Sequence, residues 1–167
     1  MDAPVMLCAD GSELSTEALR AGLELVRPDL PRQVVTVALE PDPTLLTGTG
    51  MAGGVMSPDA FQRAVEDADE EARQVALEVA ATLGVDSAHI VVLRGDPAAA
   101  LVQHAESVRA SAVVIGTRGR GGIKRAVLGS VSDHVIRHAR ARWWSPPTTA
   151  PSTSPAEGTT RGPRPGR

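Results

Sequence analysis

The sequence has very few aromatic residues and only one cysteine. Its 167 residues include one phenylalanine, two tryptophans and no tyrosine, so a surface on which nucleic-acid bases stack is not expected. The lone cysteine, Cys8, excludes an internal disulfide and any cysteine-based zinc cluster, and its apolar neighbours indicate a buried residue. Positive charge is not in excess, with 17 Lys and Arg against 20 Asp and Glu. Nucleic acid is therefore not an expected partner.

Long hydrophobic runs are also missing. No stretch approaches the roughly 20 apolar residues that a membrane helix requires. The first residues, MDAPVMLCADGS, contain an acid at Asp2 and no basic flank, unlike a signal peptide. We therefore expect a soluble, cytoplasmic protein that has no membrane partner and forms one ordinary domain.

Apolar runs and helical patterns alternate along the chain. Helices are expected from Leu14 towards Pro28, over residues 59–83, from Pro97 and from about Gly129. Strands are expected at residues 5–9, 34–39, 89–93 and 112–115. These strands are rich in Val, Ile and Leu and lack polar alternation, which is typical of a parallel sheet with helices on both faces. The predicted fold class is α/β, an open, doubly wound, Rossmann-like parallel sheet.

Two groups of polar residues invite a metal assignment, and we give them none. Residues 59–83 carry a run of acids that is typical of a solvated helix face. His134 and His138 share a helix face at i, i+4, but no glutamate accompanies them as in a zinc-protease motif. Exposed helix histidines are the simpler interpretation.

Two loops at the carboxyl ends of predicted strands carry unusual chemistry, and ligands bind at such ends in open α/β sheets. Asp10, Gly11 and Ser12 follow the first strand, and GTRGRGGIKRAVLGS follows the fourth. Glycines expose backbone N–H groups to an anion, and the next helix adds its positive N-terminal end. Cations and the hydroxyls of Ser130 and Ser132 would add attraction for phosphates. A flexible basic surface loop is the alternative that the residues leave open.

Several nucleotide and hydrolase motifs are absent. The glycines are not followed by the Gly-Lys-Ser/Thr of a P-loop, and no G-x-S-x-G nucleophile elbow occurs. Gly48, Gly50 and Gly53 spell G-x-G-x-x-G, but this run lies well past its strand and opens no helix. A dinucleotide site is therefore not predicted there.

The pattern Gly116-x2-Gly119-x9-Gly129-Ser130 resembles the nucleotide-binding signature of the universal stress protein family. The surrounding VVIGTRGRGGIKRAVLGSVSDHVIRHA, the opening VMLCADGSELSTEAL and the segment RGDPAAALVQHA are similar to three parts of that family, in the same order. The likeness extends over residues 3–138. It implies a UspA-like member of the ATP-binding type, with an adenine nucleotide alpha hydrolase-like fold.

The resemblance implies the site residues. Asp10 would reach the ribose of the nucleotide or its Mg²⁺, although a turn or capping carboxylate is the simpler alternative. Gly116, Gly119 and Gly129 would bind the phosphates of Mg-ATP, followed by the Ser130 hydroxyl. The same site would include the neighbouring residues Gly11, Ser12, Arg120, Val131 and Ser132.

No general base or nucleophile can be identified beside this site, so rapid hydrolysis is not expected. We expect ATP to act as the ligand of a regulatory stress-response protein that hydrolyses it slowly or not at all. Two alternatives remain. One is a nucleotide-independent dimerisation or chaperone-like module; the other is a slow ATPase or autophosphorylating enzyme.

The C-terminal residues depart from the family. Members continue into a fifth strand, a proline followed by valines, which often pairs two subunits, whereas this chain reads ARARWWSPPTTAPSTSPAEGTTRGPRPGR. The resemblance implies a stress-protein domain at residues 1–142, and the composition of residues 143–167 predicts a disordered Pro/Ser/Thr/Gly-rich tail. We therefore expect the fifth strand to be missing and the homodimer to be in doubt. Because Trp has a single codon, Trp143-Trp144-Ser145 read one base earlier gives Val-Val-Val, which suggests a frameshift.

Overall fold

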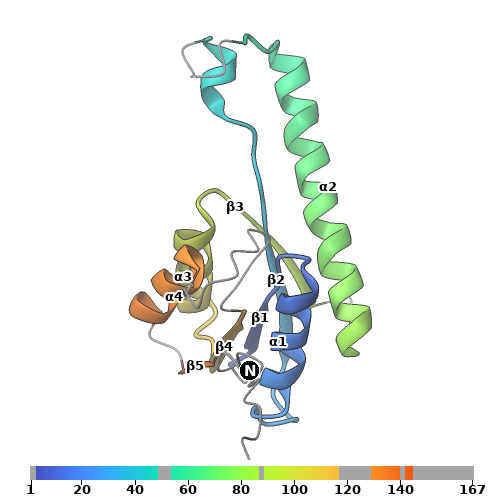
Figure 1. Ribbon diagram of the computed structural model, residues 1–167, viewed down its shortest axis with the longest axis vertical. Coiled ribbons are helices and arrows are strands. Elements are labelled where there is room, and N and C mark those ends of the chain that lie inside the picture. The colour runs from blue at the N-terminus through green and yellow to red at the C-terminus, as the bar shows by residue number, and fades with distance from the viewer. Residues whose placement is uncertain (1–2, 49–53, 87–88, 117–128, 140–141, 145–167) are drawn as a thin grey trace, which may run out of the picture.

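The structure is a computed structural model that describes residues 3–48, 54–86, 89–116, 129–139 and 142–144. Helices and strands alternate along these residues (Figure 1). The strands are β1 (Val5–Cys8), β2 (Arg32–Ala38), β3 (Ile90–Arg94), β4 (Ala112–Ile115) and β5 (Arg142–Trp144). The helices are α1 (Glu13–Leu23), the 3-10 helix η1 (Pro43–Leu46), α2 (Pro58–Leu83), α3 (Pro97–Ser107) and α4 (Ser130–His138).

The strands form one parallel sheet in the order β3-β2-β1-β4-β5. In the centre, Val5 of β1 pairs with Arg32 of β2 on one side and with Ala112 of β4 on the other. The predicted α/β class and parallel sheet are confirmed. The buried strands at the centre explain why their sequence shows no polar alternation.

Helices cover both faces of the sheet (Figure 1). Val5 and Leu7 of β1 belong to a core cluster with Leu19 of α1 and Val79 of α2. Met6 and Cys8, which alternate with them, belong to a second cluster that includes Leu101 of α3 and Val135 of α4. The period of two along the strand therefore divides the side chains of β1 between two helical layers.

The prediction that the fifth strand is missing is wrong for the described residues. Three further residues, Arg142, Trp143 and Trp144, pair in parallel with Ala112, Val113 and Val114 and form β5. Pairing of strands uses backbone N–H and C=O groups, and tryptophan favours strands, so a Val-rich segment is not required. The sheet domain thus includes residues 143 and 144, which the predicted tail had contained. Residues 145–167 lie outside the described residues.

Helix α2 is much longer than the sheet beneath it. Its C-terminal half packs on the sheet through Ala72, Ala76, Val79 and Ala80, whereas its N-terminal half continues past the sheet beside η1 (Figure 1). We call residues 39–48 and 54–71 the arm. The connection between β2 and α2 contains η1, and the Met56 N–H donates to the Leu45 carbonyl at 2.7 Å.

Candidate functional site

The chain reverses its direction across the sheet between β1 and β4. β1, β2 and β3 follow one another outward in one direction, while β4 and β5 lie on the other side of β1. Cys8 at the end of β1 pairs with Ile115 at the end of β4. The loops that begin at Ala9 and at Gly116 therefore leave adjacent strands at the same edge, where ligands bind in such sheets.

The first loop is a tight turn built by Asp10. Its Oδ1 atom accepts hydrogen bonds from the backbone N–H of Ser12 at 2.9 Å and from the Ser12 hydroxyl at 2.8 Å. Gly11 between them has φ of 81°, which a glycine adopts without steric cost. The turn role of Asp10 is thus present, and a carboxylate with about four acceptor positions can also accept from a ligand.

Ser12 connects this turn to α1. Its Oγ accepts a hydrogen bond from the Ser15 N–H at 3.1 Å, which makes it the N-cap of the helix. Ser12 therefore has a local structural role, and Glu13 adds an acid to the first turn of α1. Serine is one of the preferred N-cap residues, so the local sequence accounts for the start of α1.

The second loop joins Gly116, which follows β4 directly, to the beginning of α4. Gly129 is the N-cap of α4 and provides no side-chain cap. The first N–H groups of a helix have no partner within the helix, so Ser130, Val131 and Ser132 present theirs at its positive end. This end is suited to an anion.

The side chains at the start of α4 differ from one another. Ser130 is exposed, whereas Ser132 is buried and its hydroxyl donates to the Gly129 carbonyl at 2.9 Å. Val131 packs against the core cluster on the α3 and α4 face. Ser130 is therefore the accessible hydroxyl here, while Ser132 and Val131 contribute backbone only.

Part of the predicted phosphate site lies outside the described residues. Gly119 and Arg120 belong to residues 117–128, as do the cations Arg118, Lys124 and Arg125. The described residues place the turn at Asp10 and the start of the loop at Gly116 after the ends of adjacent strands. Val131 in the first turn of α4 packs against the core cluster that contains Cys8 and Ile115.

A polar cluster that the sequence did not predict lies at the carboxyl end of the edge strand β3. The Arg94 Nε at the end of β3 donates to Asp69 Oδ1 of α2 at 3.0 Å, and it lies 4.0 Å from Glu40 Oε1 beyond β2. The hydrogen bond from Arg94 lowers the pKa of Asp69. A cavity of about 510 Å³ is lined here by Glu66, Asp69, Glu70, Arg73, Val92 and Arg94.

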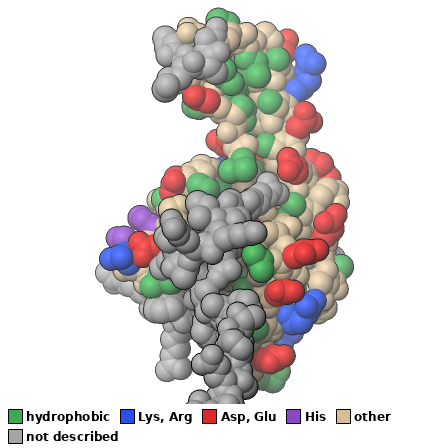
Figure 2. All heavy atoms as spheres, viewed as in Figure 1, with side chains coloured by type: hydrophobic (Ala, Val, Ile, Leu, Met, Phe, Trp, Pro, Cys, Tyr) green, Lys and Arg blue, Asp and Glu red, His purple; other side chains and the backbone are tan. Residues whose placement is uncertain are grey.

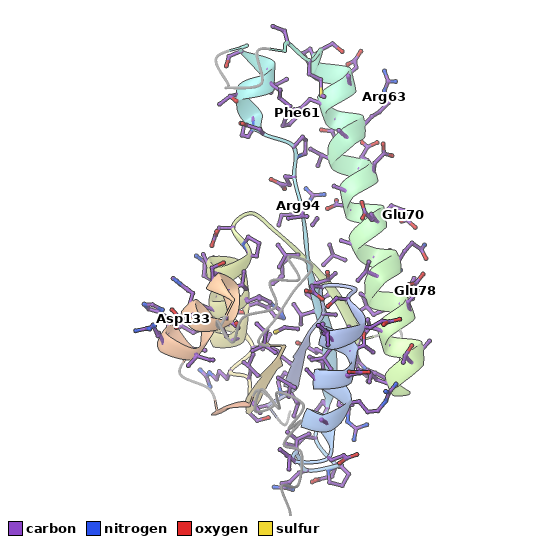
Figure 3. All side chains as sticks on the ribbon, viewed as in Figure 1. Phe61, Arg63, Glu70, Glu78, Arg94 and Asp133 are labelled. Atoms are coloured by element: carbon purple, nitrogen blue, oxygen red, sulfur yellow. The ribbon has the colours of Figure 1, made fainter. Side chains whose placement is uncertain are left out.

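The hydrogen bond from Arg94 of β3 to Asp69 connects the sheet to the arm. Arg94 lies beside α2 where the helix passes the edge of the sheet (Figure 3). Asp69 and Arg94 are 25 residues apart, so no local pattern could reveal their contact. Within the described residues, no group of three or more His, Cys, Asp or Glu side chains is arranged to hold a metal ion.

Residues 3–142 match the profile of the universal stress protein family. This match covers most of the chain and contains both loops at the switch between β1 and β4. The chain belongs to the universal stress protein family. The likeness of the glycine pattern to that family is thereby confirmed at the level of the family.

Curated relatives of this universal stress protein have similar lengths. A universal stress protein of Thermus aquaticus, named for its position in the QAH/OAS sulfhydrylase 3' region, is 30% identical over 135 residues, or 81% of this chain and 91% of that protein. Universal stress protein MJ0531 of Methanocaldococcus jannaschii is 28% identical over 135 residues, 81% of this chain and 76% of its own.

Solved structures support the fold. UspA from Lactobacillus plantarum has a TM-score of 0.65 at 14% identity, covering 86% of this chain and 97% of its own. A universal stress protein in complex with cAMP has a TM-score of 0.50 at 24% identity, covering 87% and 97%. A family member from Arabidopsis thaliana with AMP bound has a TM-score of 0.51 at 18% identity, covering 93% and 97%.

Among the described helices of this universal stress protein, none is long and apolar enough to cross a bilayer.

Proposed function

We propose that this universal stress protein binds an adenine nucleotide, namely ATP with Mg²⁺, at the carboxyl ends of β1 and β4. The observation that carries the proposal is the pairing of Cys8 with Ile115, which brings the Asp10 turn and the Gly116 loop to the point where the chain reverses. The first turn of α4 supplies N–H groups for phosphate. Family members crystallised with cAMP and with AMP support an adenine nucleotide as the ligand.

Different residues of the proposed site would bind different parts of the nucleotide. The N–H groups at Gly129 and Ser130, with the loop from Gly116, would bind phosphate oxygens, and the cations Arg118, Arg120, Lys124 and Arg125 would attract their charge. Asp10 would bind the ribose or the Mg²⁺. Magnesium is held by carboxylate and phosphate oxygens, and Asp10 is the first acid after β1.

The nucleotide would act as a regulatory ligand. Binding that favours an ordered loop stabilises that state by mass action and changes the surface offered to partners in the cytoplasm. Hydrolysis would be slow or absent, because the site would hold phosphate through backbone N–H groups and cations, without a positioned base.

Calorimetric titration with Mg-ATP tests the site. Gly129 has φ of −63°, and Gly116 is not among the glycines with positive φ, so valine at either position fits the backbone. The Gly116→Val, Gly129→Val double variant should fold and should bind Mg-ATP about tenfold more weakly or worse, because each Cβ fills space next to the phosphates.

Gly54→Val is the matched control for this titration. A Cβ at Gly54 meets no atom within 4 Å, and the residue lies on the arm. This variant should bind Mg-ATP like the wild type. Equal binding by wild type and the double variant, both folded by circular dichroism, would overturn the proposed site.

A second candidate function, a nucleotide-independent interaction module, is favoured by the arm. Hydrophobic side chains lie at its surface (Figure 2), and Leu39, Leu46 and Val55 are 66%, 40% and 77% exposed. Exposed apolar groups of this kind are typical of protein contacts. If a folded wild type binds no nucleotide while a Leu39→Ser, Val55→Ser variant loses self-association or client binding, this function replaces the first.

A further inference from the structure

Two histidines of α4 lie together on its exposed side. His134 and His138 are both exposed, and their rings are stacked with centroids 4.2 Å apart and an angle of 23° between the planes. Figure 2 shows histidine side chains at the outer edge of the molecule, next to an acidic and a basic side chain. The i, i+4 spacing places both rings on one helix face.

The hydrogen bond of His138 fixes which of its ring nitrogens can bind a ligand. Its Nδ1 lies 2.8 Å from the backbone carbonyl of His134. A carbonyl oxygen only accepts, so Nδ1 carries the proton, and in the neutral ring the lone pair is on Nε2. Metal-binding histidines commonly donate their second N–H to a carbonyl or carboxylate in this way, which holds the ring and raises its basicity as a ligand.

The charges around the pair are balanced. Arg137, between the two histidines in sequence, donates from Nε to both carboxylate oxygens of Asp133 at 3.0 and 2.9 Å. Asp133 therefore offsets the positive charge that would otherwise repel a cation. Figure 3 shows Asp133 on α4, at the outer side of the molecule.

We propose that His134 and His138 form a two-point surface site for a divalent transition-metal ion that prefers imidazole. Because the rings are stacked 4.2 Å apart, their in-plane lone pairs run nearly parallel. The His134 ring would therefore turn to direct its Nε2 at an ion bound by His138 Nε2, at the roughly 2.1 Å that is typical of an imidazole–metal bond. No third His, Cys, Asp or Glu joins them among the described residues, so water completes the coordination. Imidazole nitrogens select Cu²⁺, Ni²⁺ and Zn²⁺ over Mg²⁺ and Ca²⁺, and Cu²⁺ binds most tightly of these.

A bound metal ion would stabilise α4, because it would link His134 and His138, which are one helical turn apart. Because the ion binds only the folded helix in this way, it should raise the melting temperature of the protein in proportion to its occupancy. The site is independent of the proposed nucleotide site, since both histidines lie beyond the first turn of α4.

The test is a titration of the nucleotide-free, full-length protein with NiCl₂ and CuCl₂, followed by calorimetry and by the electron spin resonance spectrum of bound Cu²⁺. We expect one strongly bound ion per chain, nitrogen splitting in the copper spectrum and a higher melting temperature. His134→Ala and His138→Ala should each weaken binding about 100-fold, because either change removes the chelate.

His89→Ala is the matched control. His89 is also exposed and lies just before β3, but no second histidine lies three or four residues from it in the sequence. It should bind metal like the wild type. The variants should keep the wild-type circular dichroism, as both histidines of α4 are exposed. Unchanged metal binding in His134→Ala and His138→Ala, an equal loss in His89→Ala, or no saturable binding in the wild type would each overturn the site.

Discussion

Asp10 builds a turn and is also proposed to bind the nucleotide, and one substitution separates these roles. Asp10→Asn keeps an oxygen that can accept from the N–H and hydroxyl of Ser12 but removes the charge. We expect a folded variant whose affinity for ATP no longer increases when Mg²⁺ is added, because a neutral amide is a poor ligand for that ion. Calorimetry with Mg²⁺ and with EDTA measures this.

Asp10→Ala is the companion variant, since it also removes the turn. It should lose about 1 kcal/mol of stability in urea denaturation, as an N-cap or turn acceptor typically contributes. If Asp10→Asn retained the full effect of Mg²⁺ on ATP binding, Asp10 would be a structural residue only.

We expect Cys8 to make the free energy of unfolding depend on pH in the alkaline range. Burial raises the pKa of its thiol from 9.0 to about 12. Between these values the unfolded chain has lost the proton and the folded chain keeps it, so the free energy of unfolding falls as pH rises. The slope from this group is about 1.4 kcal/mol per pH unit, and its contribution is intact below pH 9.

Urea denaturation at pH 8, 9 and 10 measures this slope, and Cys8→Ala is the control. The alanine variant should be less stable at pH 8, because a buried group is lost, and should lack the part of the slope that Cys8 causes. Tyrosine ionisation does not interfere, because the chain has none. The same slope in both proteins would contradict the assignment to Cys8.

At the scale of elements, the end of α2 depends on one glycine. Gly84 is the C-cap with φ of 66°, and its N–H bonds to the carbonyls of Ala80 and Ala81. A Cβ there would meet no atom within 4 Å, so Gly84→Ala tests the backbone alone. We expect a loss of about 1 kcal/mol in the free energy of unfolding by urea.

Two further variants confirm the cause. Gly84→Asn should lose less, because asparagine tolerates the left-handed region better than alanine does. Gly54→Ala, at a glycine that has equal space and is not among those with positive φ, should not be destabilised and can gain slightly from a less flexible unfolded chain. Equal losses at both positions would show that φ is not the determinant.

The elements that sequence predicted correctly are those with local signals. Residues 112–115 form an apolar run, and α2 begins after a capping serine at Ser57 and ends before Gly84. Each signal lies within or beside its own element. The sequence of α2 does not reveal that the sheet is shorter than the helix, so that the N-terminal half is only partly covered.

The features that sequence did not predict depend on distant contacts or on side-chain direction. β5 exists because β4 offers its edge, which the residues Arg142 to Trp144 do not signal. The hydroxyl of Ser132 donates to the carbonyl of Gly129, the N-cap of α4, although the pattern of serines suggested a ligand. The meeting of the Asp10 and Gly116 loops was predictable, since it follows from the order of strands in doubly wound sheets.

At the scale of the whole molecule, the sheet has two edges, β3 and β5. Among the described residues β5 has three, and a strand of this length offers few N–H and C=O groups to the edge of another sheet. We therefore expect the protein to be monomeric at micromolar concentration, or to associate without pairing β5 across two copies. Light scattering after size-exclusion chromatography gives the mass directly.

A variant with a more strand-prone segment tests this reasoning. Replacing residues 142–145 by Pro-Val-Val-Val gives the sequence that a shift of reading frame would have produced, and its β-branched residues favour an extended strand. We expect it to form a dimer, since an edge strand of higher β propensity pairs more readily with a second copy. The Trp143→Val, Trp144→Val variant, which leaves Ser145 in place, controls for the loss of tryptophan. A wild type that already scatters as a stable dimer, with a mass unchanged in the Pro-Val-Val-Val variant, would show that β5 does not set the oligomeric state. The arm with Leu39 and Val55 would then be the surface to disrupt next.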